Sequence, residues 1–141
     1  MFGRNFHQRN GKYNNTKVEI DGIKYDSKKE SQRNAYLELM QKQGLISDLK
    51  RQVVFELIPT IYEDKVVHLK TKDKIVQRVA QKAVTYKADF TYIKDGQLVV
   101  EDVKASASYA ALDKTFILKE KMMRYFHGIV IKRVYKANVD I

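Results

Sequence analysis

The chain has 141 residues, 44% of them hydrophobic and 31% charged, which is typical of one soluble globular domain. It has no cysteine, which excludes disulfides and thiolate metal sites. It also has no apolar run near the ~18 residues that suggest a membrane span. A cytoplasmic protein without membrane contact is therefore expected. Its 27 Lys and Arg against 17 Asp and Glu give a net charge of +10, which favours a polyanionic partner.

The first third of the chain predicts a hairpin followed by a helix. Residues 1–16 are polar and are expected to form a flexible basic arm, so that a single domain runs over 17–141. Asp21-Gly22 between two short β-prone segments predicts a hairpin with a type I′ turn. Ser27 as N-cap and Gly44 as C′ residue bound a predicted helix, whose apolar stripe consists of Tyr36, Leu37, Leu39 and Met40.

The rest of the chain predicts more strands and a second helix. Residues 45–58 indicate one or two strands, and 60–82 an extra hairpin or a mobile loop. Two β-rich runs, joined by Lys94-Asp95-Gly96, follow from residue 84. A helix is expected from near Ser108 to Gly128, before a final strand in IVIKRVYKA, and its predicted apolar face comprises Ala111, Leu118, Met122 and Tyr125, with Phe126 beside them.

Two aspartates in the second hairpin form the first candidate site. If Asp95-Gly96 is a two-residue turn, the register sets Asp89 directly opposite Asp102. Their Cβ atoms would then lie roughly 4.5–5.5 Å apart, where like charges repel each other. A hard divalent cation binds carboxylate oxygens and removes that repulsion. A three-residue loop would instead set Asp89 opposite Glu101 or Val103, and that alternative stays open.

Lys104 extends this candidate site. It follows Asp102 by two residues, so both side chains are expected on the same face, about 6.6 Å apart along the strand. Carboxylates that bind a metal, beside a cation that neutralises charge on phosphate oxygens, suit phosphodiester hydrolysis. The alternative is a solvated surface pair with Asp89 as an unrelated polar residue at an edge. Glu101 is expected on the opposite face and is a weaker ligand candidate.

These residues resemble the pattern of the PD-(D/E)XK nuclease superfamily. Asp89, a gap of twelve residues, and Asp102-Val103-Lys104 at the end of an apolar strand carry the resemblance. The longer pattern YDSKKE…LKRQVVFEL…YKADFTY…VVEDVKAS, from about residue 20 to 135, resembles small phage-encoded Holliday junction resolvases. Ala88 stands where the superfamily name has proline, a position that does not touch the metal. The resemblance implies an α/β, restriction-endonuclease-like mixed sheet with a helix on each side, in the order β-hairpin, helix, three strands, helix, strand.

The resemblance also implies roles for single residues. Asp89 and Asp102 would bind Mg²⁺, with Mn²⁺ as a substitute, and Lys104 would be the catalytic lysine. Glu30 matches the acidic residue that many members add to the metal site. Alternatively, Glu30 closes a capping box on the amide of Ser27.

Basic residues of both helices are candidates for contact with nucleic acid. The expected phosphate-contacting rim consists of Lys28, Lys29, Arg33, Lys114, Lys119, Lys121 and Arg124. The alternative is an ordinary solvated face on each helix. Gln52 is expected either to reach the acidic site from a neighbouring strand or to lie at the surface. The histidines at 7, 68 and 127 have no ligand-spaced partner and are not expected to bind metal.

The predicted function is therefore a Mg²⁺-dependent endodeoxyribonuclease. The resemblance implies branched DNA, such as a four-way junction, as substrate in phage recombination or replication in the bacterial host cytoplasm. It also implies a homodimer, for which the candidate interface aromatics, or core residues of a monomer, are Tyr109, Phe116, Tyr125 and Tyr135. The alternatives are a nuclease of duplex or single-stranded DNA, a non-catalytic nucleic-acid-binding module and a structural phage protein.

Overall fold

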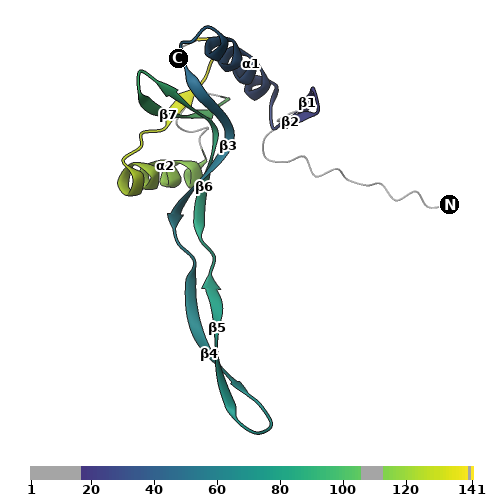
Figure 1. The fold of residues 1–141 in the computed structure, drawn as a ribbon, viewed down its shortest axis with the longest axis vertical. Helices are drawn as coiled ribbons and strands as arrows, with labels where there is room; N and C mark the ends of the chain where they lie inside the picture. Colours follow the sequence, from purple (N-terminus) through teal and green to yellow (C-terminus); the bar gives the residue numbers. More distant parts are fainter. Residues whose placement is uncertain (1–16, 106–112, 140) are drawn as a thin grey trace, which may run out of the picture.

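A computed structural model describes residues 17–105, 113–139 and 141 of the chain (Figure 1). The predicted basic arm of residues 1–16, together with Ser108, Tyr109 and Ala111, lies outside the described residues. The elements in chain order are β1 (Val18–Ile20), β2 (Ile23–Tyr25), α1 (Lys28–Lys42), β3 (Ser47–Ile58), β4 (Ile61–His68), β5 (Asp73–Gln81), β6 (Val84–Lys94), β7 (Gln97–Val103), α2 (Lys114–His127) and β8 (Lys132–Val134).

The central sheet has the strand order β3-β6-β7-β8. β3, β6 and β7 are antiparallel neighbours, whereas β8 returns after α2 and lies parallel to β7. Such a parallel return needs a crossover connection, which α2 supplies. The predicted class of a mixed α/β protein with a mixed sheet is therefore confirmed.

The N-terminal hairpin and helix form where the turn and cap residues predict them. Asp21 and Gly22 both have positive φ, 51° and 76°, as a type I′ turn requires. The Ser27 hydroxyl accepts a hydrogen bond from the Glu30 amide at 3.1 Å and so caps α1. Gly44 follows the helix with a φ of 77°, which glycine adopts without steric cost.

Residues 60–82 form a hairpin rather than a loop. β4 and β5 pair with each other as a separate two-stranded sheet, and they prolong the β3–β6 ribbon into a long arm that stands away from the body (Figure 1). Ala83 donates its amide to Thr60 Oγ1 at 3.2 Å, where the ribbon passes from the sheet into the arm. Of the two interpretations of this segment, the extra hairpin is confirmed.

The two helices cover opposite faces of β7. Val100 belongs to a buried cluster with Phe116 and Met123 of α2. The adjacent Val99 packs against a second cluster, which contains Leu37 and Met40 of α1. Because neighbouring side chains of a strand point to opposite faces, α1 and α2 lie on different sides of the sheet.

The predicted apolar face of α2 is wrong in most of its described residues, although Met122 does pack against the buried cluster. Phe116 and Met123 are the buried residues, whereas Leu118 and Tyr125 are 53% and 81% exposed. The helix also begins at Lys114 instead of near Ser108, because Asp113 has an extended backbone and its carboxylate accepts the Thr115 amide at 2.9 Å.

The last strand is shorter than IVIKRVYKA predicts, because only Lys132–Val134 pairs with β7. In the described part of the chain, neither helix is long and apolar enough to cross a membrane.

Candidate active site

The β6–β7 hairpin has the predicted register. Asp95 and Gly96 form a two-residue turn with φ angles of 49° and 75°. The strands pair from Lys94 opposite Gln97 to Phe90 opposite Glu101, which excludes the three-residue loop. Asp89 and Asp102 are the next residues in that register. The Asp89 side chain reaches β7, where its Oδ2 accepts the Val103 amide at 2.8 Å.

Asp89 lies at a break in the neighbouring strand pair. The β3–β6 pairing passes from Arg51–Phe90 to Val53–Ala88 in the same register, but Gln52, whose φ is 53°, does not pair with Asp89 between them. Residues on the two sides of this break face different helices. Phe90 packs in the cluster beside α1, but Ala88 packs in the cluster beside α2, although the two residues have the same parity in β6.

The break brings Tyr86 to the site. Strand alternation would assign Tyr86 to the face of Phe90, yet it is buried on the α2 side and donates its hydroxyl to Asp102 Oδ2 at 2.8 Å. Tyr86 is therefore a site residue that the sequence pattern does not predict. Burial and the neighbouring charge of Asp102 raise the pKa of Tyr86, so its hydroxyl remains a donor at neutral pH.

Lys104 takes the other oxygen of Asp102. Its ammonium lies 2.6 Å from Asp102 Oδ1, as expected for two side chains on one face of a strand. It also lies 3.4 Å from the ring centroid of Phe116 in α2, within range of a cation–π contact. Asp102 itself is 7% exposed. The carboxylate is therefore fixed by a hydroxyl on one oxygen and an ammonium on the other.

Glu30 and Gln52 approach the same site from α1 and β3. Gln52 Nε2 donates to Glu30 Oε1 at 3.0 Å, so Gln52 is an interior partner of the acidic group and not a surface residue alone. Arg51 lies 3.4 Å from the same oxygen. Glu30 Oε2 accepts the Asp26 amide at 3.2 Å, one residue before the amide that a capping box would use.

The other charged groups of the acidic site change the pKa of Asp89. Burial and the negative charge of Asp102 raise the pKa of Asp89 to about 7, and Glu30 contributes in the same direction. The Val103 amide and the Lys104 ammonium partly offset the rise. Asp89 is thus a carboxyl group that would gain from a further positive charge nearby.

The donor set at this site has the chemistry of a hard-cation site. Carboxylate oxygens of Asp89, Asp102 and Glu30 are ligands that Mg²⁺ and Mn²⁺ prefer. Within residues 17–105, 113–139 and 141, however, no three His, Cys, Asp or Glu side chains lie close enough together to hold a metal ion. The three carboxylates now bind Lys104, Gln52, Tyr86 and backbone amides instead.

Residues 10–138 match the model of a protein family described as "Protein of unknown function (DUF1064)". The chain belongs to this family. Comparison with curated proteins and with solved structures found no match. The match covers both helices, the central sheet and the arm, so the acidic site lies within the part of the chain that is typical of DUF1064 proteins.

Glu101 belongs to a different network on the opposite face of β7, as predicted. It is fully buried, and Arg33 of α1 binds it with two hydrogen bonds of 2.6 and 2.9 Å. Tyr92 donates to the same carboxylate at 2.6 Å. Arg33 was a predicted DNA contact, and that prediction is wrong, because the side chain has no exposed surface and its charge is paired inside the protein.

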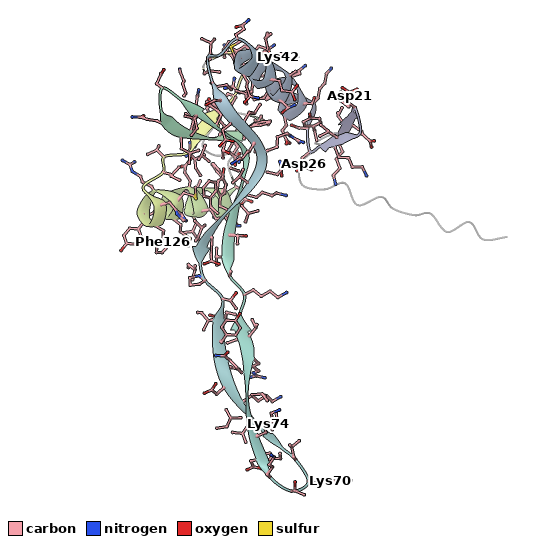
Figure 2. All side chains as sticks on the ribbon, viewed as in Figure 1. Asp21, Asp26, Lys42, Lys70, Lys74 and Phe126 are labelled. Atoms are coloured by element: carbon pink, nitrogen blue, oxygen red, sulfur yellow. The ribbon has the colours of Figure 1, made fainter. Side chains whose placement is uncertain are left out.

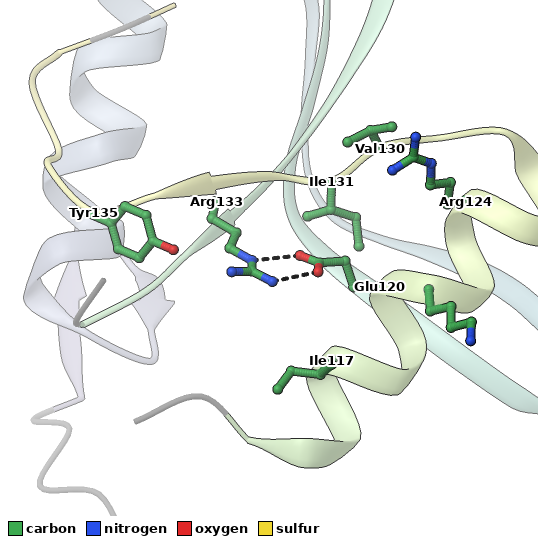
Figure 3. A pocket seen from close by; sticks show the side chains of 8 residues that line it. Ile117, Glu120, Arg124, Val130, Ile131, Arg133 and Tyr135 are labelled. Carbon is green, nitrogen blue, oxygen red and sulfur yellow. Dashed lines mark hydrogen bonds and ion pairs between the residues drawn. The ribbon is translucent and has the colours of Figure 1, made fainter. Parts of the chain in front are cut away.

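Two of the other predicted phosphate contacts line a groove between α2 and β8 (Figure 3). The groove has a volume of about 560 Å³, and Lys121 and Arg124 stand at it beside the ion pair of Glu120 with Arg133. Arg133 is the pairing partner of Asp102 in the β7–β8 ladder. The groove therefore borders the acidic site on the α2 side of the sheet.

The remaining basic candidates differ in their surroundings. Lys28 and Lys114 are exposed, and Lys119 is partly buried. Lys29 donates to the carbonyl groups of Lys104 and Ala105 at 3.1 and 3.2 Å, so its ammonium anchors the chain directly after the acidic site.

The candidate interface aromatics also separate into two groups. Phe116 is a core residue at 8% exposure, so of its two alternatives the core residue is confirmed. Tyr125 is exposed, and Tyr135 is partly buried at the groove.

Proposed function

We propose that this protein is a metal-dependent DNA endonuclease that hydrolyses phosphodiester bonds in branched DNA. The proposal is supported above all by Asp102, a buried carboxylate that contacts the ammonium of Lys104 at 2.6 Å and adjoins Asp89. Acidic groups beside a lysine ammonium are the chemistry that phosphodiester hydrolysis needs. The order and spacing of these residues also resemble the PD-(D/E)XK nucleases, and a nuclease-like fold is part of the proposal.

Each residue of this site has its own role in the proposed hydrolysis. Asp89 and Asp102, with Glu30, are the residues that would hold Mg²⁺ or Mn²⁺, and the ion would act as a Lewis acid on the scissile phosphate. The Lys104 ammonium neutralises the negative charge that develops on the phosphate oxygens in the transition state. Tyr86 fixes the orientation of Asp102. In the reaction a water oxygen loses a proton and bonds to phosphorus, the bond between phosphorus and the leaving sugar oxygen breaks, and that sugar oxygen takes up a proton.

The surroundings of the site support a nucleic acid as the substrate. The chain has a net charge of +10, and the groove next to the site carries Lys121 and Arg124.

Resolving a four-way junction requires cuts on two strands, one from each of two equivalent sites. The proposal therefore includes a homodimer, and light scattering should report about twice the chain mass of 16.5 kDa.

A cleavage assay with matched variants tests this function. Labelled four-way junction, linear duplex and single strand are incubated with the protein in Mg²⁺ or in EDTA. We expect cleavage of the junction in Mg²⁺ only. Asp102→Asn should abolish it and leave DNA binding intact, because the change removes a metal ligand and reduces repulsion of phosphate.

Asp95→Asn is the control, because it makes the same chemical change in the exposed turn of the same hairpin, where Asn-Gly also forms a type I′ turn. It should cleave like the wild type. Full activity of Asp102→Asn would refute the site, and DNA binding without cleavage by the wild type would favour a non-catalytic binding module.

A further inference from the structure

The arm formed by β4 and β5 is an element without a packing partner in the described part of the chain. Its two strands pair only with each other, and nearly all of its side chains are exposed (Figure 2). A two-stranded hairpin that stands alone is at best marginally stable in water. The eight residues of β4 extend about 27 Å at roughly 3.4 Å per residue. The arm thus presents a long ribbon, open on both faces, far from the acidic site.

The positive charge of the arm is concentrated at its tip. Residues 65–74 contain four lysines and one aspartate, a net charge of +3 with histidine neutral. The single aspartate, Asp73, already pairs with His68 at 2.7 Å. The four tip lysines are Lys65, Lys70, Lys72 and Lys74, of which Lys70 and Lys74 are labelled in Figure 2. None of them forms an ion pair with another described residue. By contrast, the proximal part of the arm carries Glu63 and Asp64 against Arg78, a net charge of −1.

One face of the ribbon is apolar in patches. Tyr62 pairs with Val79 and Val66 pairs with Ile75 across the two strands, and all four side chains are about half exposed or more. Asp64 interrupts the face between these two pairs.

We infer that the β4–β5 arm binds duplex DNA through its cationic tip, away from the site of cleavage. This inference rests on the proposed function, because that function makes DNA the ligand. A two-stranded ribbon fits the major groove, which is about 12 Å wide. Its apolar pairs would contact base edges and sugars there, and the tip lysines would contact phosphates. The tip of a second copy is a poorer partner for the tip, because residues 65–74 carry the same net charge of +3 in each copy.

The test compares two variants that remove the same charge at different places. The tip variant replaces three exposed lysines of the arm by Gln: Lys70→Gln, Lys72→Gln and Lys74→Gln. The control variant replaces three exposed lysines of the body that belong to neither the acidic site nor the groove: Lys24→Gln, Lys42→Gln and Lys136→Gln. The substitutions lie at exposed positions, so both variants should fold.

The affinity of each protein for a labelled linear duplex is measured in EDTA as a function of salt concentration. The tip variant should bind at least about tenfold more weakly than the wild type. The slope of log K against log salt should fall by roughly one for each phosphate that a lysine no longer neutralises, about two to three in total. The affinity of the control should fall clearly less. Once saturated with DNA and given Mg²⁺, the tip variant should cleave as fast as the wild type.

Several outcomes separate this inference from the proposed function. Equal binding by the tip and control variants, with cleavage by the wild type, overturns the arm inference and leaves the nuclease standing. A tip-dependent loss of binding without any cleavage by the wild type supports the arm and overturns the nuclease. If the tip variant binds DNA normally, and Val66→Ser with Ile75→Ser converts a dimer into a monomer, the arm is a self-association surface and the inference is wrong.

Discussion

Asp89 connects the stability of the folded chain to the chemistry of its candidate site. The residue is held between the negative charges of Asp102 and Glu30, and one of its oxygens is fixed by the Val103 amide. Repulsion of this kind lowers stability in the absence of a counter-ion, and a bound cation would relieve it.

The free energy of unfolding should therefore depend on pH through Asp89. Burial and the charge of Asp102 raise its pKa from 3.8 to about 7. Between these values the folded chain keeps a proton that the unfolded chain has released, so stability falls as pH rises from about 4 to 7. Asp89→Asn abolishes this titration and keeps an oxygen for the Val103 amide. In EDTA at pH 8 we expect the variant to exceed the wild type by about 1–3 kcal/mol in the free energy of unfolding.

Urea unfolding at a series of pH values measures this effect. The difference between variant and wild type should shrink as the pH falls below 7 and vanish only below the unfolded-state pKa of 3.8, where Asp89 is protonated in both states of the wild type. A variant that is less stable at pH 8, or a difference that does not change with pH, would contradict the assignment of the raised pKa.

The ion pair of Arg33 with Glu101 joins elements that are distant in the sequence. It links α1 to β7, and Arg33 also donates to the carbonyl groups of Ala137 and Val139 at 3.1 and 2.6 Å. A single guanidinium thus fixes a helix, a strand and the end of the chain behind the acidic site. Because Glu101 directly precedes Asp102, this network also holds the strand that carries the candidate site.

Replacing Arg33 alone should lower the free energy of unfolding more than replacing both Arg33 and Glu101. Arg33→Met should destabilise the chain by about 3–5 kcal/mol, because it removes the guanidinium that binds both oxygens of the buried Glu101 side chain. Adding Glu101→Gln should recover part of this loss, since Gln still accepts from Tyr92. The matched control is the exposed pair of Arg78 with Glu63, where the same two changes should cost less than about 1 kcal/mol. Additive losses at Arg33 and Glu101 would refute the coupling.

Local signals in the sequence predict the elements and half of the candidate site. Asp95-Gly96 specifies the turn and hence the register that brings Asp89 and Asp102 to adjacent strands. Ser27 and Gly44 bound α1 because caps act within one turn of the helix.

Tyr86 and Arg33 escape this kind of prediction. The contact of Tyr86 with Asp102 depends on a break at Gln52. Glutamine rarely adopts a positive φ, so the sequence does not predict this break. The burial of Arg33 depends on a carboxylate 68 residues away. In α2 two apolar stripes compete, and only the packing against Tyr86 and Val100 selects Phe116 and Met123 over Leu118 and Tyr125.

At the scale of the whole molecule, the candidate site and the basic surfaces occupy different places. The carboxylates of the candidate site lie at the break of the central sheet, the groove with Lys121 and Arg124 borders them, and the lysine-rich tip of the arm stands away from the body (Figure 1). A polyanion that contacts the basic surfaces would be drawn to the protein despite the negative charges at its centre.

A single-turnover experiment tests most directly whether the acidic site is a nuclease centre. Junction DNA is bound to excess protein in EDTA, Mg²⁺ is added, and the cleavage rate is compared between the wild type, Lys104→Ala and the exposed control Lys136→Ala. We expect the wild type and the control to cut at the same rate. Lys104→Ala should be slower by about 10²–10³-fold at unchanged DNA affinity, because its ammonium acts on the transition state. This function would be contradicted if the wild type left the DNA uncut in both Mg²⁺ and Mn²⁺, or if Lys104→Ala cut it at the wild-type rate.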